Sequence, residues 1–410
     1  MSILIGMTRL YLGALLTLSA ILRFWRLDHP SNLVFDEIYY VDGARDLLSN
    51  GVEIKNGAGE FVVHPPLGKW LIAFGVRTFG DNPFGWRFSS ALVGTISVAL
   101  IYLVAQKLFS SDFIALSAAL LTTLDGLHLV MSRVALLDIF LMALLLVAFL
   151  SFLNERHWLT ALFLGSALAV KWSALYFIIG LIIYLAIKGN RNYLKYLLLI
   201  PITYLSTWIG WFLSDIGYDR NSASNPLFSL IQYHQEIFQF HTSLTSEHPY
   251  EASPLTWLYL GRPTSFFYES PQCGGQRCSQ EILAMGTPII WWFGVIALLI
   301  IIRAIISRRD KSATLIGLAV AANYLPWLVF PERTTFYFYA IAFQPFLILA
   351  ISFAISEFLK SKLGQRSGVL IVHSWIALVT LVFIYFLPIY LGATLTYDAW
   401  FARMWFKSWI

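Results

Sequence analysis

Long apolar segments recur along the whole chain, and they constrain its fold more than any other feature. A helix that crosses the hydrocarbon core of a bilayer needs roughly 20 mostly apolar residues. Eleven segments are candidates: 8–25, 85–107, 112–130, 134–153, 157–170, 173–187, 194–213, 288–306, 312–330, 336–358 and 368–391. The division of 157–187 into two short spans is the least well defined. Backbone groups in lipid must be satisfied internally, so the sequence predicts an all-α polytopic membrane protein with about eleven transmembrane helices.

The composition excludes a soluble protein. The residues AVILMFWYC make up 58% of the 410 residues and DEKR only 12%, whereas soluble domains carry about 45–50% apolar and about 25% charged residues. A soluble protein could not expose that much apolar surface and stay dissolved. The first apolar segment lacks the A-x-A cleavage pattern of a signal peptide, so we expect it to remain as an anchor.

The distribution of charge predicts how the chain is oriented in the cell membrane. Cytoplasmic loops of membrane proteins are enriched in Lys and Arg. With the N-terminus inside, the cytoplasmic segments hold 13 of the 28 basic residues, whereas three short outer loops hold one each, Arg133, Lys171 and Arg333. An odd number of spans then puts the C-terminal segment 392–410 outside. The net charge of +5 follows from this asymmetry and does not indicate a nucleic-acid partner.

Two long segments, about 26–84 and about 214–287, fall outside the membrane in this topology. No repeat, low-complexity tract or flexible linker divides the chain, so we expect one domain, 1–410, that ends in a helical bundle at about 288–410. In the first outer segment, 37–49 and 66–79 have the pattern of short helices, and Pro65-Pro66 suits the start of the second. Four apolar residues suggest that the second helix lies in the membrane interface: Trp70, Leu71, Phe74 and Phe79.

The chain has two cysteines, Cys273 and Cys278, and both lie in the second outer segment. Outside the cytoplasm a C-x₄-C pair can close a small disulfide loop, and the glycines between the two cysteines make the tight loop easy. Two free thiols are the alternative. No further cysteines or histidines at metal-ligand spacing accompany them, so a zinc site is not expected.

The adjacent acids Asp36 and Glu37 follow the first predicted span directly. A carboxylate at such a position can act as a general base, as a metal ligand or as a helix N-cap. The capping interpretation is serious, because Asp is a favoured N-cap and Glu is favourable in the first turn of a helix. The spacing of the pair does not decide between these roles.

Four basic residues fall near the predicted outer ends of spans: Arg23, Arg87, Arg133 and Lys171. Each can be explained as an anchor that reaches toward the interface. Together they could bind an anionic headgroup such as a lipid monophosphate. Asp125, His128 and Asp138 add polar groups within or at the ends of spans, where charges are costly and often functional. Pairing with Arg133, five residues earlier, is the structural alternative for Asp138.

An outward-facing acid near several cations suits an enzyme that removes a group from a lipid phosphate. Phosphate is already a good leaving group, so a sugar bound to it needs little acid assistance. The hydroxyl that accepts the sugar does need a base, because its pKa lies far above 7. One carboxylate and a set of cations that stabilise the departing phosphate would be sufficient.

Several segments resemble the protein O-mannosyltransferase family, a branch of the C-type glycosyltransferase superfamily. The resemblance runs in order over nearly the whole chain, through LRFWRLDHPSNLVFDE, VHPPLGKWLIA, WRFSSALVGTISVALIYLVA, LDGLHLVMSRVALLDIFL, GSALAVKWSALY and HPYEASPLTWLYLGRP. It implies a C-type glycosyltransferase fold with two structured extracytoplasmic loops. It also implies inverting transfer of mannose from a polyprenyl-phosphate-mannose donor to Ser or Thr of secreted or membrane proteins, which would be met as they leave the secretion machinery.

The resemblance also implies roles for particular residues. Asp36 matches the presumed base, with Glu37 beside it, and the phosphate-contacting basic positions match Arg23, Arg87 and Lys171. His64 falls in the His-Pro-Pro motif, and His248 and Tyr250 fall in an outer-loop motif that would line the acceptor groove. Arg133 and Asp138 are further candidates for lining the site. We expect no cofactor, since the cations already supply positive charge at the phosphate, although a water-bridged Mg²⁺ or Mn²⁺ at Asp36-Glu37 is an alternative.

The second outer segment departs from the family in one respect, and two other functions are alternatives. Eukaryotic members carry a large β-trefoil insertion in the second outer segment, and 214–287 is too short for it, so the chain looks like bacterial, chiefly actinobacterial, members. A C-type glycosyltransferase with the same kind of donor but a different sugar, or with a lipid or glycan acceptor, is the nearest alternative. A transporter or a lipid-binding protein is less consistent with the sequence, because neither inverted repeats nor matching broken spans are found.

Overall fold

The computed structural model describes residues 2–410. Seventeen α-helices make up most of this part of the chain: α1 (Ser2–Phe24), α2 (Glu37–Asn50), α3 (Leu67–Phe79), α4 (Pro83–Phe109), α5 (Asp112–Thr123), α6 (Gly126–Met131), α7 (Asp138–Leu153), α8 (His157–Leu168), α9 (Ala174–Ile187), α10 (Leu199–Ser206), α11 (Ile209–Leu213), α12 (Pro226–Ser243), α13 (Pro288–Arg308), α14 (Lys311–Tyr324), α15 (Gln344–Lys360), α16 (Lys362–Tyr390) and α17 (Tyr397–Phe401). The prediction of a mostly helical fold is confirmed.

Every predicted span coincides with helical structure. Five helices in residues 2–410 are long and apolar enough to cross a bilayer: Gly6–Phe24, Pro83–Phe109, Pro288–Arg308, Lys311–Val329 and Lys362–Tyr390. The shorter apolar helices are Asp112–Thr123, Asp138–Leu153, His157–Leu168, Ala174–Ile187 and Leu194–Ser206. The predicted span 112–130 is divided into α5 and α6, because Asp125 turns its carboxylate to the N–H of His128 and begins a new helix there. The count of eleven spans stays a prediction.

The centre of the bundle is formed by α7 and α15, which are buried on nearly all sides. Helix α7 packs against α4 and α8, and α15 packs against α13, α14, α5 and α16. A helix that is apolar on every face belongs in such a position. In contrast, α16 exposes apolar side chains along its length, such as Leu370, Leu381 and Ile384, as expected of a helix that faces lipid.

The first outer segment contains the two predicted short helices. Helix α2 begins at Glu37, and α3 begins after Pro66. One face of α3 is buried through Ile72 and Ala73, while Phe74 and Phe79 are exposed. That amphipathic pattern fits a helix in the membrane interface.

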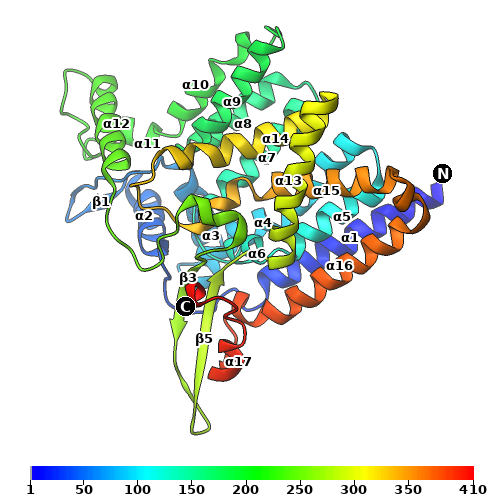
Figure 1. The fold of residues 1–410 in the computed structure, drawn as a ribbon. Helices are drawn as coiled ribbons and strands as arrows, with labels where there is room; N and C mark the ends of the chain where they lie inside the picture. Colours follow the sequence, from blue (N-terminus) through cyan, green and yellow to red (C-terminus); the bar gives the residue numbers. More distant parts are fainter. Residues whose placement is uncertain (1) are drawn as a thin grey trace.

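The second outer segment contains a sheet that the sequence analysis did not predict. Strands β3 (Thr264–Glu269) and β5 (Gln276–Ala284) pair antiparallel, and β4 (Gln272–Cys273) and β6 (Thr394–Thr396) also pair with β5. A second, two-stranded sheet joins β1 (Ile54–Lys55) and β2 (Ala58–Gly59) in the first outer segment. Figure 1 shows the long β3–β5 hairpin, α17 and the C-terminus on the opposite side of the bundle from the N-terminus.

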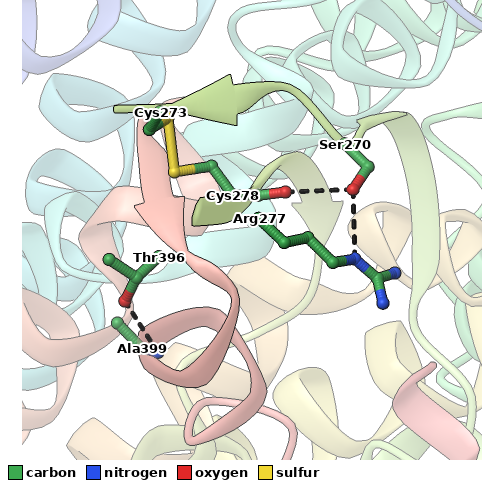
Figure 2. The surroundings of a disulfide bond; sticks show 6 residues. All are labelled: Ser270, Cys273, Arg277, Cys278, Thr396 and Ala399. Carbon is green, nitrogen blue, oxygen red and sulfur yellow. Dashed lines mark hydrogen bonds between the residues drawn. A yellow bond between two sulfur atoms is a disulfide. The ribbon is translucent and has the colours of Figure 1, made fainter. Parts of the chain in front are cut away.

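The two cysteines lie beside the turn of this hairpin. Cys273 and Cys278 form a disulfide, and the turn between them contains two glycines with positive φ, Gly274 and Gly275. Ser270 lies beside Cys278, and its Oγ donates to the carbonyl of Cys278 at 3.1 Å (Figure 2). Arg277 Nε donates in turn to Ser270 Oγ at 3.3 Å. The disulfide therefore links β4 to β5 beside the hairpin turn.

Candidate functional site

Glu37, the first residue of α2, is completely buried and fully hydrogen-bonded. Its Oε1 accepts from Arg87 Nε at 2.8 Å and from the N–H of Ala135 at 2.8 Å. Its Oε2 accepts from Arg87 Nη2 at 2.8 Å and from the N–H of Val34 at 2.9 Å. An ionised carboxylate has about four lone-pair sites, and all are used here. Glu37 therefore joins the first outer segment to α4 and to the turn before α7, and it has no capacity left to take a substrate proton.

Arg87, in the first turns of α4, is equally saturated. Besides Glu37 it donates to three carbonyls, those of Leu27 (3.3 Å), Pro30 (2.7 Å) and Asn32 (3.0 Å). A guanidinium has five N–H groups, and these contacts use all of them. The geometry therefore leaves Arg87 no donor for an incoming phosphate, contrary to the role expected from the sequence. It holds the chain that leads from α1 to Asp36.

Arg23 and His128 also lie inside the protein. Arg23 is fully buried at the end of α1, where Nη1 donates to Ser19 Oγ at 2.7 Å and Nη2 to His128 Nδ1 at 2.7 Å. The other ring nitrogen of His128 lies 2.8 Å from Ser97 Oγ. Asp125 accepts from the indole N–H of Trp291 at 2.8 Å and links α6 to α13. These contacts engage both terminal nitrogens of Arg23, whereas its Nε is buried without a hydrogen-bond partner.

Arg133 closes the C-terminal end of α1. Its guanidinium donates to four carbonyls, those of Leu22 (3.0 Å), Arg23 (2.9 Å), Trp25 (2.8 Å) and Arg26 (3.3 Å). A cation at this end of a helix satisfies free carbonyls and opposes the negative end of the helix dipole. Arg133 does not pair with Asp138, which was the structural alternative for that acid.

Asp138 pairs instead with Lys171. Lys171 Nζ donates to Asp138 Oδ1 at 2.8 Å and to Oδ2 at 3.0 Å, and it lies 4.4 Å from the centroid of the Tyr339 ring. Both charged side chains are nearly buried. Two of the three ammonium protons are engaged, so one donor of Lys171 remains. The charge of Lys171 also acts on the carboxylate of Asp36.

Asp36, unlike Glu37 and Asp138, has a carboxylate that is not held by a cation. It occupies the N-cap position of α2, but its side chain makes no capping hydrogen bond. The geometry thus disfavours the capping interpretation. Burial raises the pKa of Asp36 to about 6, with Lys171 opposing the rise and Asp138 adding to it, while the Tyr40 hydroxyl donates to the carboxylate. A half-buried carboxylate with a pKa near the working pH is well suited to accept a proton.

Phe35 sets the backbone turn that presents Asp36. Its φ of +49° lies in the left-handed region, which a bulky residue rarely adopts. Four rings surround it with centroids between 5.2 and 5.7 Å away: Phe266, Phe336, Phe338 and His248. Surrounding structure must hold such a conformation in place. His248 therefore acts on Asp36 through Phe35, and Tyr250 contacts His248 and Arg262 farther out.

A group of residues beside Asp36 includes four that the sequence did not mark as parts of the site, namely Tyr40, His241, Arg333 and Tyr339. His64 stacks on His241 with ring centroids 5.4 Å apart, and the ring of Tyr40 lies 6.0 Å from that of His64. Arg333 Nε donates to the carbonyl of His241 at 3.0 Å, and its remaining side-chain contacts are long, 3.4 and 3.5 Å. Tyr339, beside Lys171, completes the group. Arg333 stood out in the sequence only as the single cation of a short outer loop.

Burial is the main influence on the pKa values of the two histidines in this group. Burial, then Lys171, His241, Lys69 and Arg333, lower the pKa of His64 well below its ordinary value. Burial also lowers the pKa of His241 to about 4. Both rings are thus neutral at pH 7, and Nδ1 of His64 is buried without a hydrogen-bond partner. A buried polar atom without a partner, close to two cations, is consistent with a place for an anionic ligand.

Comparisons with known proteins find relatives over nearly the whole chain. A family model described as dolichyl-phosphate-mannose-protein mannosyltransferase matches residues 63–211, and one described as the C-terminal four-transmembrane region of protein O-mannosyltransferase matches 226–409. Curated relatives named polyprenol-phosphate-mannose–protein mannosyltransferase are 31% identical in Corynebacterium glutamicum (92% of this chain, 88% of the relative) and in Mycolicibacterium smegmatis (96% and 91%).

Two solved structures share the fold. The protein O-mannosyltransferase complex of S. cerevisiae with its sugar donor superposes with a TM-score of 0.82 at 16% identity, over 98% of this chain and 92% of that chain. ArnT from Cupriavidus metallidurans with undecaprenyl phosphate superposes with a TM-score of 0.61 at 18% identity, over 93% and 70%. At such low identity these two likenesses show a common architecture.

Proposed function

The chain belongs to the protein O-mannosyltransferase family, and from that premise we propose how it performs the transfer. It is a polyprenyl-phosphate-mannose–protein mannosyltransferase that moves mannose from the lipid carrier to Ser or Thr hydroxyls of proteins. The observation that carries the mechanism is the division between the two adjacent acids: Glu37 is closed off by Arg87, whereas Asp36 remains available beside Lys171.

Asp36 is the general base. The acceptor oxygen attacks C1 of mannose while Asp36 takes the hydroxyl proton. The bond from C1 to the phosphate oxygen breaks, and polyprenyl phosphate departs with the electron pair. Attack from the face opposite the phosphate inverts the configuration at C1. The raised pKa of Asp36, about 6, makes its carboxylate a stronger base than an exposed Asp while leaving it ionised at pH 7.

The donor phosphate is bound by Lys171 and Arg333, with His64 beside them. This assignment keeps Lys171 from the set expected from the sequence and replaces Arg23 and Arg87. Those two arginines are fully buried. Lys171 and Arg333 each retain donors, and both act on the same histidine, His64. Cations that face the leaving phosphate stabilise the charge that develops there.

No divalent metal is needed in this proposal. Lys171 and Arg333 supply the positive charge that a metal would otherwise place at the phosphate. Activity should therefore survive EDTA.

The site faces the outer side of the cell membrane, with the N-terminus in the cytoplasm and the C-terminus outside. The charge asymmetry of the loops supports this orientation. Asp36 and the residues around it lie in the two long outer segments and the short outer loops. Acceptor chains would then reach the site as they leave the secretion machinery.

The decisive experiment supplies membranes with radiolabelled polyprenyl-phosphate-mannose and a peptide rich in Ser, Thr and Pro. Mass spectrometry should find a single hexose on a Ser or Thr of the peptide, and membranes with the Asp36→Asn protein should form almost none. Label that appears only in lipid or glycan would overturn a protein acceptor and favour the related glycosyltransferase activity.

A further inference from the structure

A cavity with several charged residues on its wall lies at the other end of the bundle from Asp36, on the side predicted to face the cytoplasm. It has a volume of about 480 Å³ and is bounded by the turns between α7 and α8, after α9, and between α13 and α14. Each of these turns contains one residue with positive φ: Glu155 (58°), Gly189 (65°) and Arg309 (52°). The turns are therefore short and tightly bent, and they hold the rim of the cavity in a defined shape.

The charges that line this cavity are mostly positive. Lys188, Arg309 and Lys311 are the cations, and Glu155 is the one carboxylate. Within residues 2–410, none of the three cations forms an ion pair. Three cations without ion-pair partners around one cavity indicate a place where an anion can bind.

Two further features describe the ligand. The first turn of α14 lines the cavity through Lys311 and Thr314, whose ammonium and hydroxyl groups can donate to a phosphate. The N–H of Ala313 in the same turn donates to the carboxylate of Asp310, which caps the helix. The apolar side chains beside the cations are directed outward from the bundle. Ile187 is 79% exposed and Ile306 is 77% exposed, one residue before Lys188 and three residues before Arg309. Acyl chains could pack there while a phosphate enters the cavity.

We propose that this cavity binds the phosphate headgroup of an anionic phospholipid from the cytoplasmic leaflet. Basic pockets between membrane helices on this side are suited to such headgroups. The shared chemistry is a phosphate group, and a soluble phosphate is the other possible source. The exposed isoleucines beside the cations favour the lipid. This site is separate from the donor site and does not depend on the proposed function.

The test measures the binding of short-chain fluorescent phosphatidylglycerol to the full-length protein in detergent, with phosphatidylcholine of the same acyl chains as reference. Three proteins are compared: wild type, Arg309→Gln/Lys311→Gln, and Lys362→Gln/Arg366→Gln. The last is a matched control that removes one Lys and one Arg on the same predicted side, away from the cavity. Wild type and control should prefer phosphatidylglycerol, and the cavity variant should bind it about tenfold more weakly.

Two results would contradict the proposal. Equal preference in the cavity variant and the wild type would overturn the site. Displacement of the lipid by millimolar inorganic phosphate would overturn the lipid as the occupant and favour a soluble phosphate. If the double variant does not fold, Lys188→Gln provides the same test from a different turn, since this exposed side chain makes only a distant contact with the Tyr184 ring.

Discussion

The carboxylate of Glu37 and the guanidinium of Arg87 form a two-point ion pair that is closed to solvent, with both N–O distances at 2.8 Å. Asp36, the residue directly before Glu37 in the chain, is half-buried and takes no part in this ion pair. Because Glu37 is fixed at the first position of α2, the turn before it has one geometry. The acid pair thus divides its work: Glu37 holds the turn, and Asp36 takes the proton.

Exchanging each acid for its amide should separate these two roles. Asp36→Asn removes the proton acceptor and should slow transfer at least about a hundredfold, while the protein still folds and binds donor lipid. Glu37→Gln leaves the buried Arg87 without its counter-charge, which costs about 3–5 kcal/mol of stability. Thermal unfolding and turnover measured on both variants test this. Near-normal turnover by a folded Asp36→Asn protein would remove Asp36 as the base.

The pH dependence of turnover should report Asp36. Only the ionised carboxylate accepts a proton, so the rate should rise with pH through about 6 and then level off. The charge of Lys171 lowers the pKa of Asp36, so Lys171→Met should move this midpoint upward in addition to weakening donor binding. Rate profiles at saturating donor measure the midpoint. A midpoint that stays unchanged in Lys171→Met would contradict the proximity of the two charges.

Phe35 should matter to the rate more than to donor binding. Phe35→Ala removes the ring that four aromatic neighbours hold, which allows the turn to relax and Asp36 to shift. A displacement of about 1 Å in a catalytic group can cost about a hundredfold in rate. We expect kcat to fall by one to two orders of magnitude with KM for the donor little changed. Tyr250→Phe, farther out, is the control. Parallel loss of kcat and donor affinity in Phe35→Ala would indicate general damage.

The orientation in the membrane can be tested with single cysteines in a protein whose Cys273 and Cys278 are both Ser. Removing so short a disulfide loop should cost little stability. Lys55→Cys and Ala402→Cys lie on exposed positions of the predicted outer side, and Lys362→Cys lies on the predicted inner side. An impermeant thiol reagent added to intact cells should label the first two and not the third. Labelling of Lys362→Cys would contradict the topology.

The helices could be predicted from the sequence, whereas the sheet could not. Apolar runs and the α2 and α3 patterns are local, so they can be read from neighbouring residues. Although β3 and β5 form a local hairpin, the sheet is completed by β6, whose Thr396 pairs with Cys278 more than a hundred positions earlier. The phosphate-binding role expected for Arg87 stays a prediction, but the contact that bears on it is also distant in the sequence. Arg87 and Glu37 are 50 residues apart, and their pairing removes Arg87 from the list of available cations.

Local spacing alone also suggests the wrong ion-pair partner for Asp138. Arg133 precedes it by five residues, but α7 begins only at Asp138, so no helix brings the two side chains together. Lys171, 33 residues later, takes the place of Arg133. In the sequence Arg333 is notable only as the single cation of a short outer loop, because no motif around it indicates a binding site. Residues that meet through the fold alone have to be found in the structure.

The last prediction distinguishes the two proposed sets of phosphate-binding residues. Arg333→Gln removes a guanidinium that has free donors and lies at the surface of the site, so it should weaken donor binding and slow transfer together without reducing stability. Arg333→Lys should recover part of the loss, since a point charge replaces a planar fork. Arg87→Gln should instead unfold the protein at a lower temperature, because Glu37 and three carbonyls lose their donors. Donor affinity, turnover and thermal unfolding measured on the three variants give a distinct pattern for each role. If Arg87→Gln remains stable and loses only donor affinity, while Arg333→Gln binds donor normally, the phosphate lies near Arg87 and the saturated geometry must open when the donor enters.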